Sequence, residues 1–197
     1  MAEFGTIEDF DKLLEEIHAR DMKLVIDLVV NHTSDEHKWF KEALKSKDNP
    51  YHDYYIWRDA TDAGITPPNN WISLFKGSAW NYYENLNQWA LHLFTKKQMD
   101  LNWENEKVRQ SVYEMMLWWL DKGVDGFRMD VINFISKTEG LPEANAFMGM
   151  LTGYKGAEYY FYGPRLHEFL HEMREKTFGN YDVYTLAFFD CVFVEID

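Results

Sequence analysis

Residues 123–134 read GVDGFRMDVINF, and both the fold and the chemistry can be inferred outward from them. Gly123 follows an amphipathic helical pattern, a position where glycine commonly caps a helix. The short apolar run after it carries Arg128 and Asp130, and side chains two residues apart on a strand lie on one face. Arginine beside aspartate favours the ionised carboxylate, which predicts either a structural salt bridge or an aspartate suited to act as a nucleophile.

The order of helix followed by strand occurs three times along the chain. The pairs are 6–21 with 22–30, 104–122 with 124–130, and 164–178 with 182–189. The first strand is apolar nearly throughout, which predicts burial on both faces. This alternation predicts a parallel sheet with crossover helices, either a β/α barrel or an open doubly wound sheet. Because no glycine-rich phosphate loop follows a strand, a nucleotide-binding fold is disfavoured.

The segment 31–103 interrupts this alternation. It is rich in Trp, Tyr, Asn and Pro, and a structureless loop of such length is rare. We therefore expect a small inserted subdomain at 31–103, on the strand end that carries the active site in β/α barrels. The remaining residues, 1–30 and 104–197, would form part of a catalytic barrel. Most aromatic residues of the subdomain are expected in its core, and the candidates for stacking on a ligand are Trp57, Trp71, Trp80 and Tyr82.

The composition excludes several classes of partner. The 197 residues carry a formal net charge of -13 without a basic cluster, which disfavours nucleic acid and anionic membrane surfaces. The single cysteine, Cys191, permits no internal disulfide, and no zinc-ligand spacing occurs. No run is long enough to span a bilayer, and the first residues lack the features of a signal peptide. The expected location is therefore the cytoplasm.

The first strand also ends in polar residues. It reads DLVVNH, which places Asp27, Asn31 and His32 near its carboxyl end. Asp27 lies in an apolar run, and a buried carboxylate needs a partner, which Arg128 on a neighbouring parallel strand would provide. Together with Asp130, these residues predict retaining glycoside hydrolysis, in which an ionised carboxylate attacks the anomeric carbon of a sugar.

Three segments resemble signature regions of the α-amylase family of glycoside hydrolases. They are DLVVNH (27–32), QMDLNWEN (98–105) and GFRMDVIN (126–133), and their order and spacing agree up to about Thr185. Residues 131–133, with ISKTEGLPEA and YFYGPRLHEF downstream, resemble the oligo-1,6-glucosidase and dextran glucosidase group. The resemblance implies about strands 3 to 5 of a (β/α)8 TIM barrel, and an α-glucosidase acting on oligosaccharides such as isomalto-oligosaccharides.

The resemblance also implies a role for each site residue. Asp130 would be the nucleophile, and Arg128 would hold it in place and charged. His32 would hydrogen-bond the sugar in the first subsite, while Asn31 and Asp27 would support the site. In calcium-dependent relatives an asparagine at the place of Asn31 helps to bind the metal, but the oligo-1,6-glucosidase group generally lacks that site. No metal or other cofactor is therefore predicted.

The sequence departs from the family after Thr185. The general acid should be a glutamate in a segment that reads roughly Thr-Val-Gly-Glu, but Phe188 stands there and Glu195 is out of register. The family's other barrel strands have no counterpart in the chain. We therefore expect an internal fragment, ended by a frameshift, a truncation or an assembly boundary. It would be inactive alone, because a phenyl ring cannot donate a proton.

Three alternatives stay open. An enzyme that isomerises sucrose or forms trehalose would differ in loops that this chain holds only in part. A non-catalytic binding or assembly protein, such as an amino-acid transporter heavy chain, would share the fold, although those proteins carry a membrane helix and degraded catalytic positions. An unrelated α/β fold with a chance Arg–Asp pair would not explain the three matched segments.

Overall fold

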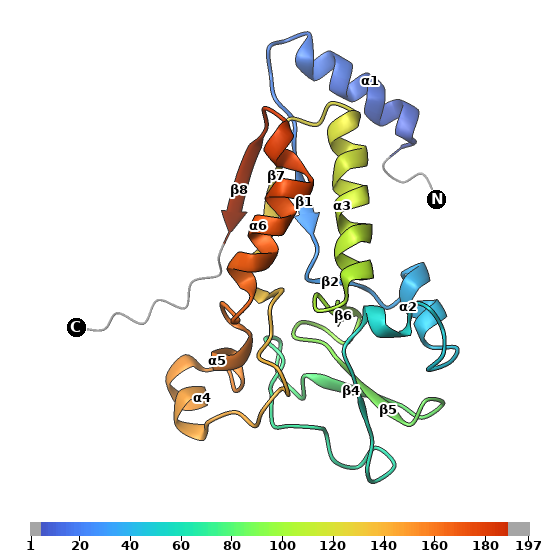
Figure 1. Cartoon of the computed structure of the whole chain (residues 1–197), viewed down its shortest axis with the longest axis vertical. Helices are drawn as coiled ribbons and strands as arrows, with labels where there is room; N and C mark the ends of the chain where they lie inside the picture. Colours follow the sequence, from blue (N-terminus) through green and yellow to red (C-terminus); the bar gives the residue numbers. More distant parts are fainter. Residues whose placement is uncertain (1–4, 189–197) are drawn as a thin grey trace, which may run out of the picture.

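The computed structural model describes residues 5–188 of the chain (Figure 1). The helices are α1 (Ile7–His18), α2 (Lys38–Ala43), α3 (Glu106–Asp121), α4 (Ala146–Thr152), α5 (Ala157–Tyr160) and α6 (Leu166–Lys176). The strands are β1 (Val25–Val29), β2 (His32–Ser34), β3 (Trp57–Asp59), β4 (Trp80–Tyr83), β5 (Gln88–Leu91), β6 (Gln98–Asp100), β7 (Gly126–Asp130) and β8 (Tyr184–Phe188). Short 3₁₀ turns lie at His52–Tyr54, Ile132–Phe134 and Phe178–Asn180.

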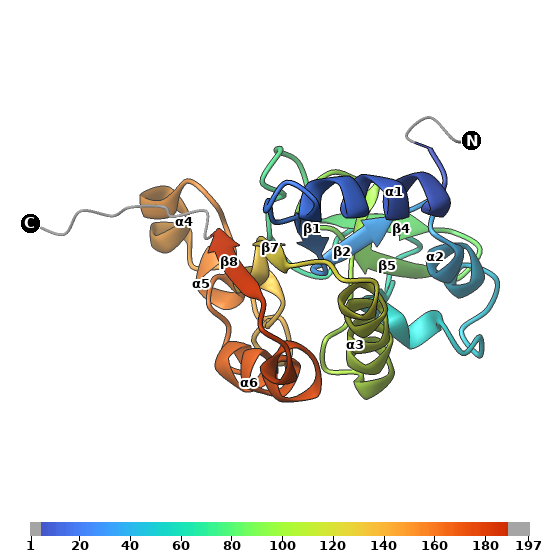
Figure 2. The same cartoon turned by 90° about the horizontal axis from the view of Figure 1, so that it is seen from above.

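The central sheet is parallel, with the strand order β1–β7–β8. Its register places Asp27 opposite Arg128 and Val29 opposite Asp130. Helices α3 and α6 lie side by side on one face of this sheet (Figure 2). The predicted parallel sheet with crossover helices is confirmed. The third helix begins at Leu166 rather than at the predicted Pro164.

The covered face of the sheet forms the main core. Leu28, Phe127 and Met129 point towards the helices and are at most 5% exposed. The helices contribute the buried residues Val108, Val112, Met116, Leu120, Leu166, Phe169 and Met173. These positions recur at helical spacing, so the amphipathic pattern predicted which side of each helix is buried.

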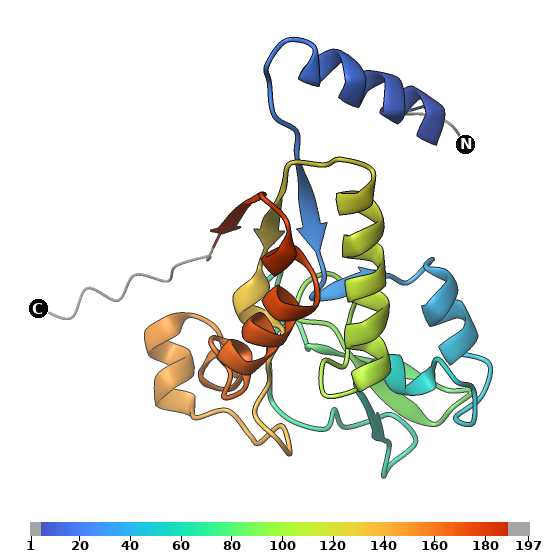
Figure 3. The ribbon, with the colours of Figure 1, turned by 45° about the horizontal axis from the view of Figure 1, so that its top comes forward.

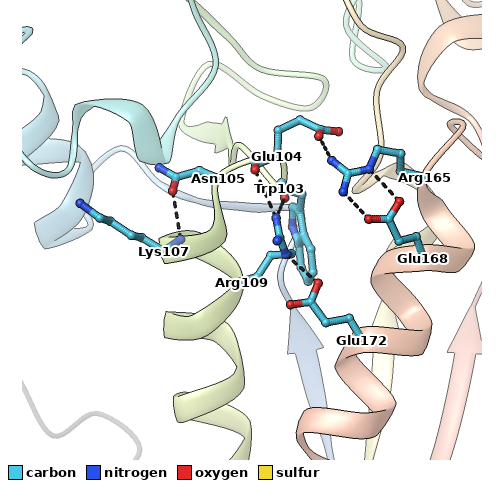
Figure 4. A network of polar contacts seen from close by, with 8 residues as sticks. All are labelled: Trp103, Glu104, Asn105, Lys107, Arg109, Arg165, Glu168 and Glu172. Carbon is cyan, nitrogen blue, oxygen red and sulfur yellow. Dashed lines mark hydrogen bonds and ion pairs between the residues drawn. The ribbon is translucent and has the colours of Figure 1, made fainter.

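Ion pairs join α3 to α6 on the outer side of this core (Figure 4). Arg109 donates to Glu172 at 2.8 Å, and Arg165 contacts both Glu104 and Glu168. The guanidinium carbons of Arg109 and Arg165 lie 5.4 and 4.7 Å from the ring centre of Phe169. These contacts link α3 and the segment before it to α6 and the segment before it.

The first strand is not buried on both faces, and that prediction is wrong. Val25 and Val29 are 40% and 45% exposed, whereas Leu28 between them is 2% exposed. Asp27 is also exposed, so its predicted burial is wrong too. Within residues 5–188 the helices cover one face of the sheet only, and the exposure therefore alternates along the strand.

The segment from β2 to β6 lies beyond the carboxyl ends of the parallel strands (Figure 1). There β2 pairs with β6, and β5 lies between β3 and β4, all antiparallel. Trp57, Trp71 and Trp80 are at most 8% exposed, which assigns them to the core rather than to a stacking surface. A second core combines Trp71 and Trp80 with Phe134 and Tyr160, which follow β7. The domain boundaries at 30 and 103 stay a prediction.

Helix α1 lies beyond the amino ends of the strands (Figure 3). It begins as predicted at the N-cap Thr6, which forms a capping box with Asp9. At its other end His18 Nε2 lies 2.7 Å from Asp125 Oδ2, and the same carboxylate accepts from Lys23 and from the backbone of Leu24, both at 2.8 Å. Asp125 therefore connects α1 and β1 to the segment before β7.

This cluster predicts a dependence of stability on pH. Burial alone would raise the pKa of Asp125, but the hydrogen bonds from Lys23, Leu24 and His18 lower it to about 2. The pKa is lower in the folded chain than in the unfolded chain, so the stabilisation is full above about pH 4 and is lost as the pH falls towards 2. Asp125→Asn should lower the free energy of unfolding by about 1–2 kcal/mol at neutral pH, since the exposed partners are screened.

Urea unfolding of both proteins between about pH 2 and 7 measures this difference. Glu15→Gln, an exposed change on α1, is the control and should stay within about 0.5 kcal/mol of the unaltered chain. A difference for Asp125→Asn that does not shrink on acidification would contradict the assignment.

Candidate functional site

One guanidinium organises the uncovered face of the sheet. Arg128 Nη1 donates to Asp27 Oδ1 at 2.9 Å and to Asp130 Oδ1 at 3.0 Å. Both hydrogen bonds raise the pKa of Arg128, and the bond to Asp27 has the larger effect. The predicted partnership of Asp27 with Arg128 is confirmed, and it forms at the surface, with the two side chains 58% and 35% exposed. The arrangement orients the Asp130 carboxylate, which is 31% exposed, at the carboxyl end of β7.

The backbone directly after Asp130 is strained. Val131 has φ 42° and ψ 37°, in the left-handed region that β-branched residues rarely adopt. The turn is held by the hydrogen bond from the Phe134 backbone to the Val131 carbonyl and by the burial of Val131, which is 5% exposed. Such conformations cost about 1–3 kcal/mol and cluster at functional sites. This strain ends β7 at Asp130 and is an independent indication of a site there.

His32 begins β2 and is 7% exposed, close to the end of β1. Its Nε2 lies 3.0 Å from Gln98 Nε2, and its Nδ1 lies 3.3 Å from Asn31 Nδ2. Both amides are fixed, because Thr95 donates to Gln98 Oε1 at 2.9 Å and Lys137 donates to Asn31 Oδ1 at 2.9 Å. Each ring nitrogen of His32 therefore lies beside an amide N–H donor. A protonated ring would carry an N–H at both nitrogens and would meet a donor at each, so the geometry favours the neutral ring.

The surroundings of His32 act in the same direction. Burial is the largest effect and lowers the pKa of His32, and the Lys137 ammonium lowers it further. The Asp100 and Asp130 carboxylates act in the opposite direction, but the pKa remains below its usual value. A neutral imidazole can donate one hydrogen bond and accept another, as recognition of a hydroxyl group requires.

A buried ion pair lies behind His32. Lys137 Nζ and Asp100 Oδ1 are 2.8 Å apart, and the two side chains are 5% and 0% exposed. Asp100 also accepts from Asn31 Nδ2 at 3.1 Å and from the backbone of Leu93 at 2.8 Å. Asn31 therefore contributes to the site by orienting His32 and by binding an internal ammonium. Within residues 5–188 no three His, Cys, Asp or Glu side chains converge as metal ligands would.

The Lys137 ion pair predicts a large loss of stability on substitution. Lys137→Met leaves Asp100 as an unpaired buried charge, which should cost about 3–5 kcal/mol of the free energy of unfolding. Urea unfolding measures this loss. Lys97→Met, a change at an exposed lysine without a salt bridge in the described part of the chain, is the matched control and should cost less than about 0.5 kcal/mol. Equal losses for the two variants would contradict the role of the pair.

Sequence reasoning missed three residues of this site. Gln98 and Asp100 lie in the segment QMDLNWEN, and its resemblance to the family implies no role for either side chain. Lys137 follows the apolar run INFIS, and a lysine after an apolar run is usually exposed. The signal available was Asp100 itself, since a carboxylate in a strand that becomes buried requires a cation nearby.

The expected general-acid position adjoins the nucleophile in the sheet. Position 188 on β8 pairs in register with Asp130 on β7. The structure thus brings the backbone of Phe188 beside the candidate nucleophile. Glu195, Cys191 and the divergent tail beyond position 188 lie outside the described residues.

A family model and the sequences of similar proteins indicate the same family for this chain. Residues 1–189 match the family model described as the alpha amylase catalytic domain. Oligo-1,6-glucosidases of Bacillus cereus and Halalkalibacterium halodurans are 59% and 58% identical over 95% of this chain. A trehalose-6-phosphate hydrolase of Bacillus subtilis is 55% identical over 94% of it. The chain covers 33%, 33% and 32% of these relatives, so it spans about a third of their length.

Solved structures agree with the sequences. The trehalose-6-phosphate hydrolase of Bacillus licheniformis superposes with a TM-score of 0.90 at 49% identity, over 98% of this chain and 33% of that one. The trehalulose synthase of Pseudomonas mesoacidophila superposes with a TM-score of 0.88 at 48% identity, over 95% of this chain and 33% of that one. The described fold is thus the fold of the corresponding third of these enzymes.

Proposed function

The chain belongs to the alpha-amylase family of catalytic domains, and from this premise we propose that it is a segment of a retaining α-glucosidase acting on α-1,6-glucosidic bonds. The observation that carries the proposal is the Asp27–Arg128–Asp130 cluster, in which one guanidinium orients a carboxylate at a strained strand end. In this proposal β1, β7 and β8 are strands 3 to 5 of a (β/α)8 barrel. Residues 31–103 are its inserted subdomain.

The roles follow from retaining chemistry. Asp130 attacks the anomeric carbon and forms a covalent glycosyl intermediate, while a general acid protonates the departing oxygen. Water then attacks the intermediate, and the same acid, now deprotonated, removes the proton of the water. Arg128 keeps Asp130 aligned, and the neutral His32 hydrogen-bonds a hydroxyl of the sugar. Asn31 and the Lys137–Asp100 pair fix His32.

The same proposal makes this chain inactive alone. A retaining enzyme needs two carboxyl groups, and Phe188 stands where the second is expected. The cytoplasmic location expected from the sequence stays a prediction. In the described residues no helix is both long and apolar enough to cross a bilayer.

The names of the relatives support a proposal for the substrate class. Several of them are named oligo-1,6-glucosidases, at 57–59% identity over at least 93% of this chain. We therefore propose isomalto-oligosaccharides as substrates of the whole enzyme, with α-1,4 bonds as the poorer substrate. The superposition on a trehalulose synthase favours a second candidate, an enzyme that isomerises sucrose.

A chimera tests these alternatives. Residues 1–187 replace the matching third of the Bacillus cereus oligo-1,6-glucosidase, which supplies the other strands and the glutamate. We expect kcat/KM on isomaltose to exceed that on maltose by at least about tenfold, a difference of ~1.4 kcal/mol in transition-state binding. The unaltered relative, assayed in parallel, is the control. Faster turnover of maltose would remove the α-1,6 assignment, and trehalulose as the main product from sucrose would favour the isomerase.

A further inference from the structure

A cavity of about 390 Å³ opens between β3, β5 and the segment 135–141. Of the candidate-site residues only Lys137 lines it, so it lies outside the Asp27–Arg128–Asp130 cluster. Its volume is within the range of small-molecule sites. The residues that matter for its chemistry are Asp53, Trp57, Arg58, Gln88, Trp103 and Glu139.

Gln88 in the cavity wall has an unmet hydrogen-bond acceptor. The side chain is 8% exposed, and its Nε2 donates to Asp59 Oδ1 at 3.0 Å. This contact fixes the orientation of the amide. Gln88 Oε1 is then buried, and within residues 5–188 it receives no hydrogen bond. Buried polar atoms are nearly always paired, so this oxygen indicates a donor that the chain itself does not supply.

Arg58 in the same wall has unmet donors. The guanidinium is half-buried, and burial lowers its pKa. Its Nη1 donates to the carbonyl of Trp57 at 2.9 Å, and in the described part of the chain it forms no salt bridge. A guanidinium carries five N–H donors and accepts nothing, so Arg58 can bind further acceptors in the cavity.

The charges around the cavity disfavour an anionic occupant. Glu104 is paired with Arg165 (Figure 4) and Lys137 with Asp100, so each of these two charges has a partner of opposite sign. The carboxylates of Asp53 and Glu139 and the guanidinium of Arg58 remain. Their sum is one net negative charge, which repels an anion.

A hydroxyl group can meet both the unmet donors and the unmet acceptor of the cavity wall. It can accept from Arg58 while it donates to Gln88 Oε1 or to the Glu139 carboxylate. Trp57 and Trp103, which are 8% and 1% exposed, support this wall from the core behind the polar groups. An apolar ligand would leave Gln88 Oε1 unpaired, and a pure anion would meet the excess negative charge.

We propose that this cavity is a second saccharide site, which binds a neutral sugar unit through Arg58, Gln88 and Glu139. The site needs neither Asp130 nor a general acid, so it is a binding function beyond the proposed hydrolysis. It would hold an oligosaccharide at a position separate from the bond that is cleaved.

The test uses the 197-residue chain with isomaltotriose as the probe. NMR titration follows the indole N–H signal of Trp57, which donates to the His52 carbonyl at 2.8 Å beside the cavity. We expect saturable shifts with a Kd in the range of about 1–10 mM. Arg58→Met and Glu139→Ala should each weaken binding by about tenfold, the usual effect of losing a hydrogen bond to a charged group.

Asp130→Asn is the comparison variant for this site, and it should leave the titration unchanged. Glu139 is exposed, so Glu139→Ala does not depend on core packing. Binding that survives Arg58→Met and Glu139→Ala but disappears in Asp130→Asn would place the sugar at the candidate active site and overturn the proposal. No shift up to about 50 mM would also overturn it. Tighter binding of glucuronate than of glucose would remove the neutral-sugar assignment. The chimera assay tests the hydrolytic proposal independently.

Discussion

Asp130→Asn in the full-length chimera is expected to lower kcat on isomaltose by at least about 10⁴-fold, because it removes the proposed covalent nucleophile. Asparagine keeps the shape of the side chain and can still contact Arg128, whose Nη1 lies 3.0 Å from the carboxylate. It cannot supply the ionised oxygen that attacks the anomeric carbon. Initial rates at saturating isomaltose measure the loss.

Asp27→Asn is the matched control for this variant. Both aspartates contact the same guanidinium nitrogen, at 2.9 and 3.0 Å, and each substitution removes one negative charge beside it. If Asp130 acted only by balancing Arg128, the two variants would lose similar activity. We expect Asp27→Asn to lose less than about tenfold, since within residues 5–188 the Asp27 side chain contacts the site through Arg128. Similar losses would contradict the nucleophile.

The sequence could predict the parallel sheet because helices and strands carry different periods. The apolar spacing of α3 identified its buried face, and Gly123, with φ 98°, lies at the predicted helix end. The exposure of β1 could not be predicted in the same way. An apolar run shows that a strand tolerates burial, but it does not show which neighbours cover it. Val25 and Val29 are exposed because no helix of the described chain covers their face of the sheet.

The candidate site was predictable where it depends on strand geometry. Arg128 and Asp130 share a face through the two-residue period, and parallel pairing brings Asp27 beside them. The Lys137–Asp100 pair depends on tertiary contacts between distant segments, which no local pattern encodes. Val131 in a left-handed conformation contradicts local preference altogether, so only packing explains it.

Restoring a carboxyl group at position 188 is expected to produce a large gain in activity. In a chimera that carries residues 1–188, with Phe188 in place of the relative's glutamate, Phe188→Glu is expected to raise kcat on isomaltose by about 10²–10⁴-fold. Position 188 is in register with Asp130, and neighbouring strands lie about 4.8 Å apart. The two carboxyl groups can then approach the separation of about 5–5.5 Å that retaining glycosidases require.

Phe188→Gln separates proton donation from a mere gain of space or polarity. Glutamine matches glutamate in size and hydrogen-bonding reach, but its amide N–H is not acidic enough to protonate the departing oxygen. Activity in the glutamate variant should fall as the pH rises through the pKa of the new acid, because only its protonated form acts in the first step. Equal activities for the two variants, or a gain without this pH dependence, would mean that position 188 does not supply the acid. The second carboxylate would then have to come from another strand, and the pairing of position 188 with Asp130 would not identify the general acid.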